Sequence, residues 1–401
     1  MNVRAATVGF ALLALDAAAA VVGYEVSATA TVATRAPLPG DVAIGATTDL
    51  QLDPVAAGAI QWTRTLLTLR YAPQLIIREP QVAARVLPLH NAIVTLQHRF
   101  TRASLLLSED ASYGVADIGS LRLPAGAMPT GVFEVQTLGA VPYVRSASYA
   151  VLDVRPNDRV TATLSAAWLL SGDPTGGRAL PLQSGPAGTA TLNLTVDRRL
   201  HLITTVQASH AVFNTGGEQS IGFFTEGLQW ALARPTTLTL SAGVALTRER
   251  VVQLEGGPPP GLFFEALPVA QAGLASTLDL KGIPVQLQLG VQLSPFADRF
   301  TGFVYERLEG RASANSRLTR ELTAGASLGT GYAIDLGRAP QAGDSATFAE
   351  ASLRWDRTNW FALVGTGRAV WTEQPRTMSP GQMLWAFTLA AVVRDRDTTS
   401  W

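Results

Sequence analysis

Alternation of apolar and small polar side chains, along segments of about ten to thirteen residues, is the feature that most restricts how this chain can fold. In the clearest segment, residues 189–196, Ala, Leu and Val alternate with Thr and Asn. The same alternation recurs over residues 237–247, 285–294 and 321–328. Because successive side chains of a strand point to opposite faces, each segment predicts a strand with one apolar and one polar face. Helical spacing fits none of the four.

The predicted strands are joined by connections of two kinds. We count about 16 to 18 strands between Val22 and Arg394, each long enough to cross a membrane at a tilt. Short polar turns, such as Asp197–Arg199, Lys281–Gly282 and Ala314–Ser316, alternate with longer connections rich in Gly and Pro. An up-and-down antiparallel barrel requires this rhythm, because odd and even connections lie at opposite rims. The predicted fold is therefore all-β, a single up-and-down antiparallel transmembrane β-barrel over residues 21–401.

A soluble β-sandwich also alternates, and it is the competing fold. The polar faces here carry Thr, Ser, Gln, Gly and Asn in place of the Lys and Glu that coat a solvated sheet. Charged residues make up 15% of the chain, whereas about 25% is usual for soluble domains. An open sheet of this many strands would expose long edges, whereas a closed barrel pairs its backbone groups. We therefore expect the apolar faces to meet lipid and the polar faces to line a lumen.

Several tryptophans lie near the ends of predicted strands. Their amphipathic rings are suited to a membrane interface, where aromatic residues form girdles. Tryptophans scattered through a core are the alternative. The predicted interface residues are Trp168, Trp230, Trp355, Trp360, Trp371 and Trp385.

Residues 1–20 have the order of a secretory signal peptide. A short positive start is followed by the apolar stretch Ala5–Leu15 and by the small residues Ala17–Ala20. Asp16 is atypical of such a stretch, and an Ala-rich helix of the mature protein is the alternative. If the signal is removed, the mature chain begins near Val21 and crosses the inner membrane.

The signal-like start, strands such as Thr189–Val196 and Pro284–Ser294, and the rhythm of tight turns and long loops resemble porin-like outer-membrane β-barrel proteins of Gram-negative bacteria. The resemblance covers nearly all of the chain beyond Val22. It implies a location in the bacterial outer membrane, contact with outer-membrane lipid and insertion by the barrel-assembly machinery. Such barrels typically end in a strand that closes on an aromatic residue. Trp401 follows a polar stretch, so we expect the last strand to stop near Val393.

Composition excludes several classes of function. The chain has no cysteine, which rules out disulfides, thiolate metal sites and cysteine nucleophiles. Its 31 basic and 31 acidic residues balance, so no basic surface for nucleic acid is expected. Its four histidines form no ligand motif, so we predict neither a metal nor another cofactor.

Ser209, His210 and Asn214 invite comparison with outer-membrane phospholipases, which use Ser, His and Asn. Adjacent residues of a strand face opposite ways, so His210 is not placed to activate Ser209. The sequence therefore predicts a protein that is not an enzyme.

Ionisable residues within predicted strands should face the lumen, because Arg or Lys on the lipid face costs about 2–4 kcal/mol at the bilayer midplane. Glu306 has the opposite phase to its charged neighbours Arg307 and Glu309, which indicates a bulge, a strand end or a different strand register. These side chains form either a charged constriction that filters solutes or a network of salt bridges that fills a narrow barrel or lines a wet interior. The predicted lumen residues are Arg64, Arg70, Glu109, Arg145, Asp153, Arg307, Glu309, Arg311, Glu350, Arg354 and Arg368.

Gly114–Pro142 is the longest predicted connection, and it carries apolar residues such as Leu121 and Phe133. We hypothesise that it folds into the barrel as a partial plug. The favoured function is a porin-like channel or conduit for small solutes. A structural or surface-interaction barrel with a closed lumen and, less favoured, an outer-membrane hydrolase are the alternatives.

Overall fold

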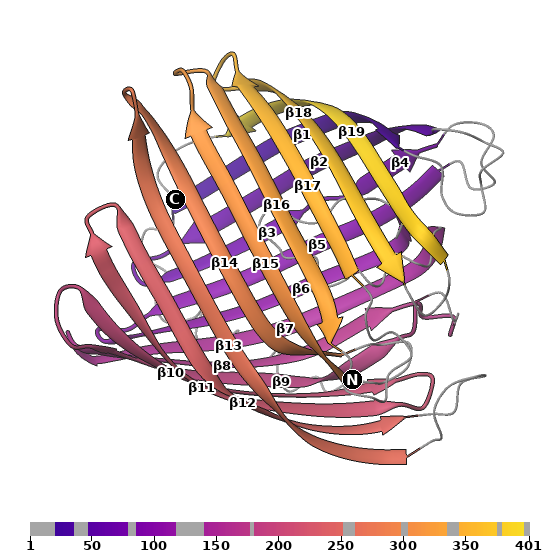
Figure 1. Ribbon diagram of the computed structural model, residues 1–401. Coiled ribbons are helices and arrows are strands. Elements are labelled where there is room, and N and C mark those ends of the chain that lie inside the picture. The colour runs from indigo at the N-terminus through magenta and orange to yellow at the C-terminus, as the bar shows by residue number, and fades with distance from the viewer. Residues whose placement is uncertain are drawn as a thin grey trace.

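The computed structural model of the protein describes residues 21–35, 47–78, 86–117, 140–176, 180–251, 261–297, 304–334, 345–374 and 379–396. The predicted signal peptide and residues 118–139 of the predicted plug lie outside these ranges. The described residues form nineteen strands in one antiparallel sheet (Figure 1). None of the described segments is a helix long and apolar enough to cross a membrane.

The strands follow one another around the sheet in sequence order. They are β1 (Val21–Arg35), β2 (Thr47–Gln61), β3 (Thr65–Tyr71), β4 (Gln74–Ile77), β5 (Val86–Arg99), β6 (Ala103–Asp117), β7 (Ala140–Asn157), β8 (Val160–Gly172), β9 (Gln183–Thr195), β10 (Leu200–Phe213), β11 (Glu218–Ala233), β12 (Thr236–Val251), β13 (Gly261–Leu280), β14 (Ile283–Ala297), β15 (Val304–Arg317), β16 (Leu322–Ile334), β17 (Ser345–Asp356), β18 (Phe361–Gln374) and β19 (Ser379–Arg396).

The sheet closes on itself, because β1 pairs with both β2 and β19. β3 and β4 share one place between β2 and β5, and they are separated by Ala72 and Pro73. Proline has no N–H for the ladder, which explains a break at this point. The barrel therefore has 18 strand positions, and the predicted up-and-down barrel of about 16 to 18 strands is confirmed.

The two rims differ in their connections. We call them the tight-turn rim, where β1 begins and β19 ends, and the long-loop rim. Lys281 and Gly282 connect β13 to β14 at the tight-turn rim with φ of 56° and 85°, the backbone of a type I′ hairpin. The predicted turn Ala314–Ser316 is wrong, because these residues continue β15 and the turn lies at 318–321. β19 also runs to Arg396, beyond the predicted end at Val393.

The turn between β9 and β10 shows how a side chain holds such a connection. The carboxylate of Asp197 accepts hydrogen bonds from the backbone N–H groups of Arg199, at 2.6 Å, and Leu200, at 2.9 Å. These bonds stabilise the charged form and lower the pKa of Asp197 below its usual value.

The apolar faces of the strands point outward. On β12, Leu246 is 63% exposed, whereas its neighbours Ala245 and Thr247 are buried. Strand pairing carries this phase around the barrel, and Leu289 and Leu389 are likewise more than half exposed. Rows of leucine and valine therefore surround the outside, as a transmembrane barrel requires, and they do not meet across a dry interior as in a sandwich.

Candidate functional site

The inner face of the barrel carries most of the predicted ionisable residues. The exposed residues of each strand mark its outer face, so the residues that alternate with them lie on the lumen side. Strand pairing extends this assignment from one strand to the next. The predicted residues found there are Arg70, Arg145, Asp153, Arg307, Glu309, Arg311, Glu350, Arg354 and Arg368. The inner face of these strands is thus both polar and charged.

Glu109 is a correction to the sequence prediction. It pairs with Val94 and shares its face of β6 with the exposed Tyr113, so its side chain lies on the outer surface. Its carboxylate accepts hydrogen bonds from the hydroxyls of Ser146 and Ser148 on β7. These bonds offset part of the cost of placing a carboxylate toward lipid.

Arg64 is a second correction. It lies in the turn between β2 and β3 and not within a strand, so it belongs to the tight-turn rim. Its backbone carbonyl accepts a hydrogen bond of 2.8 Å from the N–H of Arg99. The side chain therefore has no strand phase that would direct it into the lumen.

Most inner charges have an acidic or basic partner nearby. Arg145 on β7 pairs with Asp110 on β6 at 3.0 Å, and Arg368 on β18 lies 3.9 Å from Glu350 on β17. The carboxylate of Asp153 instead accepts a hydrogen bond from the hydroxyl of Thr163. The sequence left open a charged constriction or a network of salt bridges. These contacts are closer to the second, because they are local salt bridges along the barrel wall.

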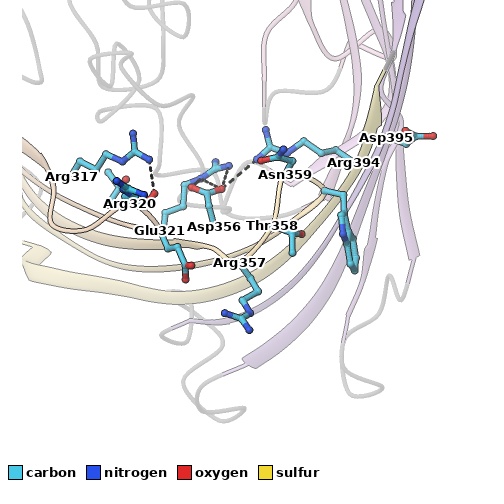
Figure 2. Close-up of a pocket in the computed structure, with 12 residues that line it drawn as sticks. Arg317, Arg320, Glu321, Asp356, Arg357, Thr358, Asn359, Arg394 and Asp395 are labelled. Carbon is cyan, nitrogen blue, oxygen red and sulfur yellow. Dashed lines mark hydrogen bonds and ion pairs between the residues drawn. The ribbon is translucent and has the colours of Figure 1, made fainter. Parts of the chain in front are cut away.

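An arginine cluster lines the mouth at the tight-turn rim, around a cavity of about 970 Å³. Asp356 at the end of β17 accepts hydrogen bonds of 2.7 to 3.0 Å from Arg354 and lies 3.5 Å from Arg394 of β19. Figure 2 shows Arg317 and Arg394 on the same side of the wall as Asp356, with Arg357 pointing the other way. Three inner arginines thus surround one aspartate, which leaves this mouth attractive to anions.

The sequence prediction missed Arg317, Asp356 and Arg394 in this cluster. Arg317 has the same strand phase as Arg311 on β15, and Asp356 the same as Arg354 on β17, so for these two the phase was available as a signal. Arg394 is related to Arg368 only through the pairing of β18 with β19. What the sequence lacked was the pairing that brings the ends of β15, β17 and β19 to one rim.

At the long-loop rim, the hairpin of β14 and β15 turns into the lumen. β13 pairs with β12 up to Gly261, but its pairing with β14 stops at Ala270 and Leu293. β14 and β15 continue together to Ala297 and Val304, and Figure 1 shows them diverging from the β12–β13 hairpin. The ends of these two strands, Ser294–Ala297 and Val304–Arg307, which we call the tip, therefore have no β13 partner.

Burial of consecutive residues shows where the tip goes. Val304, Tyr305, Glu306 and Arg307 are all at most 5% exposed, although alternate residues of a barrel strand normally face lipid. The sequence showed that Glu306 has the opposite phase to its charged neighbours. The structure explains this, because Glu306 lies near the end of β15, where side chains on both faces of the strand are buried.

The tip packs on the inner wall of β11–β13. Val304 joins an apolar cluster with Ile221, Ala245 and Leu267, and its backbone N–H donates a 2.7 Å hydrogen bond to the carboxylate of Glu249. Beyond these residues, Arg307 forms an ion pair with Glu309, and both side chains are buried. The tip narrows the lumen at this level.

The six predicted interface tryptophans all lie on the outer face or in an outer turn. Trp230, Trp355 and Trp360 are exposed near the tight-turn rim, whereas Trp168 and Trp371 are exposed toward the long-loop rim. Trp385 is half-buried beside Phe387, with ring centroids 5.6 Å apart. This placement in two groups is the one expected of aromatic girdles.

The histidines lie apart from one another. His90 shares a 2.7 Å hydrogen bond with Tyr71, and His210 shares one of 2.9 Å with Ser220. Ser209 faces the lumen and His210 the outside, as predicted from strand alternation. Within the described ranges, no group of three or more His, Asp or Glu side chains is arranged to hold a metal ion.

Solved structures with a similar fold cover nearly all of the chain. OccAB4 of Acinetobacter baumannii is 11% identical with a TM-score of 0.52, over 94% of this chain and 98% of that chain. OpdQ of Pseudomonas aeruginosa is 11% identical with a TM-score of 0.51, over 95% and 98%. OpdK, an outer membrane protein of Pseudomonas aeruginosa, is 10% identical with a TM-score of 0.50, over 94% and 99%.

These likenesses show the fold, which is that of a porin-like outer-membrane barrel, as the sequence predicted. No curated protein matches the sequence. One family model does match, over residues 14–398, and its description is the EpsX exopolysaccharide export family. The chain therefore belongs to the EpsX exopolysaccharide export family.

Proposed function

We propose that this barrel conducts an exopolysaccharide chain through its lumen, out of the cell. The observation that carries the proposal is the inner wall of β8–β11, where none of the described side chains that face the lumen is Arg, Lys, Asp or Glu and most bear a hydroxyl or an amide. Hydrogen bonds from such groups to sugar hydroxyls and to water are similar in free energy, so one readily replaces the other. A polymer is then bound weakly at many places and strongly at none.

The ends of the lumen support the same function. The arginine cluster lies at the tight-turn rim, which faces the periplasm if the long loops lie outside as in other outer-membrane barrels. Guanidinium groups attract carboxylate, phosphate or sulfate substituents, which are common means by which a polysaccharide becomes anionic. The cluster would concentrate such a polymer at the inner mouth.

A diffusion channel for small solutes is the second candidate, because the fold is that of porins. The two functions differ in the size of what passes. Liposomes that contain the protein swell in neutral sugars of both small and large size if the lumen conducts a polymer, and only in small ones if it is a size-limited filter. Among the described residues, His210 and Ser220 form a hydrogen-bonded Ser–His pair, but it lies on the outer face of β10 and β11 and not in the lumen.

The absence of cysteine makes a direct test simple, because any introduced thiol is unique. Ser165→Cys places a thiol on the inner face of β8, and Leu164→Cys places one on the outer face, where Leu164 is 51% exposed. Cells that carry either variant as their only copy are treated with a bulky hydrophilic maleimide. We expect surface polysaccharide to fall after modification of Ser165→Cys and to continue in Leu164→Cys cells. Undiminished export by a fully modified Ser165→Cys protein would contradict the proposal.

We further propose that residues 1–20 direct export across the inner membrane and are then removed, and that the barrel-assembly machinery inserts the mature chain. The apolar stretch before Ala17–Ala20 supports the first step. Sequencing the N-terminus of protein purified from outer membranes tests it, with Val21 or a close neighbour as the expected first residue.

A further inference from the structure

A cavity of about 600 Å³ lies inside the barrel where the inward-turned tip of β14–β15 meets the wall of β9–β11. The wall contributes Gln219 and Phe223 from β11, and the tip contributes Phe296, Arg307 and Glu309. The cavity is thus bounded by an uncharged surface on one side and an ion pair on the other. It lies at the level where the tip narrows the lumen, so a polymer that threads the barrel passes it.

Gln219 lines the cavity and carries an unpartnered side-chain oxygen. Its side chain is 8% exposed, and the oxygen Oε1 has no hydrogen-bond partner in the structure. A buried carbonyl without a donor is destabilising, so proteins rarely keep one without a reason. Because Gln219 lines the cavity, a hydroxyl of a molecule bound there would supply the missing donor.

Two aromatic rings give the cavity apolar surfaces. Phe223 projects from the wall, and Phe296 projects from the tip with the guanidinium of Arg307 4.4 Å from its ring centroid. A pyranose ring has one face made of C–H groups, which packs on an aromatic ring, and an edge of hydroxyls, which needs polar partners. Small-molecule sites generally combine apolar surfaces with a few placed polar groups in this way.

The ion pair supplies polar partners of both kinds. Arg307 and Glu309 are at most 6% exposed, so their hydrogen bonds to a ligand would form away from bulk water. A guanidinium donates and a carboxylate accepts, and hydrogen bonds to charged groups are stronger than those between neutral groups. Since the two charges neutralise each other, the cavity as a whole favours a neutral ligand.

We propose that this cavity is a saccharide-binding subsite for one or two neutral pyranose units. In it, Gln219 accepts a hydrogen bond from a sugar hydroxyl, Phe296 and Phe223 pack on the C–H face of the ring, and the Arg307–Glu309 pair binds other hydroxyls. That this sugar is part of an exported polymer rests on the function proposed above, whereas saccharide binding itself does not. The subsite would hold the chain in register at the narrow part of the lumen.

Current through single barrels in planar bilayers tests the subsite. The full-length mature protein is reconstituted, and maltohexaose, a neutral oligosaccharide, is added to one side. We expect transient blocks of the current whose residence time shortens about three- to tenfold in Gln219→Leu, the loss expected for one hydrogen bond. Phe296→Leu should shorten the blocks as well, because it removes the aromatic surface and keeps the residue apolar.

Gln97→Leu is the matched control. Gln97 also lies on an inner face, that of β5, but it borders a different cavity near the tight-turn rim. Its blocks should last as long as those of the wild-type protein. Heat-modifiable migration on gels shows that each variant has folded. Wild-type residence times in both Gln219→Leu and Phe296→Leu, or no block of a conducting wild-type barrel, would overturn the proposal.

The two proposals fail in distinguishable ways. If maltohexaose does not bind but modification of Ser165→Cys stops export in cells, the subsite is absent and the export function stands. If the blocks occur and depend on Gln219 while export survives the obstructed lumen, the subsite stands and the polymer takes another route.

Discussion

Two parts of the inner surface differ sharply in their chemistry. The neutral wall, the inner face of β8–β11, carries Thr, Ser, Gln, Asn, Gly, Ala, one histidine (His201) and a few apolar residues but no Arg, Lys, Asp or Glu among the described residues. The charged wall, the inner face of β15–β19, lies on the far side of the closed barrel. Its ionisable residues are Arg307, Glu309, Arg311, Arg317, Glu350, Arg354, Asp356, Arg368 and Arg394.

The difference teaches that the inner wall of a barrel can be polar without being charged. Hydroxyls and amides two residues apart along a strand already give the neutral wall a polar partner about every 7 Å. The charged wall adds a local field and strong pairwise contacts. If the barrel conducts a sugar polymer as proposed, the polymer gains adhesion from the first wall and a preference for one sign of charge from the second.

The largest expected effect comes from breaking an ion pair of the charged wall. Arg307→Ala leaves the carboxylate of Glu309, which is 6% exposed, without its guanidinium. Removing one partner of a buried pair costs about 3–5 kcal/mol in the free energy of unfolding. Urea unfolding in lipid vesicles, followed by tryptophan fluorescence, measures the loss.

Two further variants serve as controls for Arg307→Ala. The double variant Arg307→Ala/Glu309→Ala should recover much of the stability, because no unpaired charge remains. Gln207→Ala on the neutral wall should lose no more than about 1 kcal/mol, as for a contact between neutral groups. Equal losses for Arg307→Ala and Gln207→Ala would show that the walls do not differ in this respect.

A charge placed on the neutral wall tests whether its neutrality serves the fold or the function. Thr205 faces the lumen on β10, and the adjacent Val206 faces outward and is 48% exposed. Val206→Arg should lower the free energy of unfolding by about 2–4 kcal/mol, because the charge faces lipid, whereas Thr205→Arg should cost far less. A similar loss for both, measured in the same vesicles, would mean that the wall is not open to water.

The alternation of the sequence predicted this two-faced barrel because the period-two pattern is local and repeats on every strand. It predicted the wrong phase for β6, where Glu109 and Asp110 are adjacent and one of them must point outward. The structure places Asp110 inside, where it pairs with Arg145, and Glu109 outside, where two serines bind it. That choice depends on β7, which is distant in the sequence.

The inward turn of the β14–β15 tip could not be predicted from the sequence for the same reason. The odd phase of Glu306 indicated an irregularity, but the contacts of Val304 with Ile221 and Ala245 join segments far apart in the chain. The cavity that Gln219 lines is formed only when this tip lies opposite β11. The sequence analysis selected ionisable residues as candidates for the lumen, so it did not consider Gln219.

A smaller effect is expected on ion selectivity. Arg354→Gln combined with Arg394→Gln removes two guanidiniums beside Asp356 at the tight-turn mouth. Exposed charge interactions are worth about 0–1 kcal/mol, so the permeability of anions relative to cations should fall by up to about fivefold. The reversal potential in a KCl gradient measures it. Gln207→Leu on the neutral wall should leave this potential unchanged, and a shift of equal size there would remove the distinction between the walls.

The smallest effect is expected at the tight-turn rim of the neutral wall, where Asp197 stabilises the turn between β9 and β10. Because its folded-state pKa lies below the usual value of 3.8, the hydrogen-bonded carboxylate stabilises the turn above about that pH, and the contribution is lost as pH falls through the folded-state pKa. Asp197→Ala should therefore unfold at a lower urea concentration than the wild-type protein at pH 7, with the difference shrinking near pH 3. Asp197→Asn keeps the acceptor oxygen without the charge, so its own turn bonds should not titrate. A difference between wild type and Asp197→Ala that persists unchanged to pH 3 would mean that packing, and not the ionised carboxylate, holds this end of the wall.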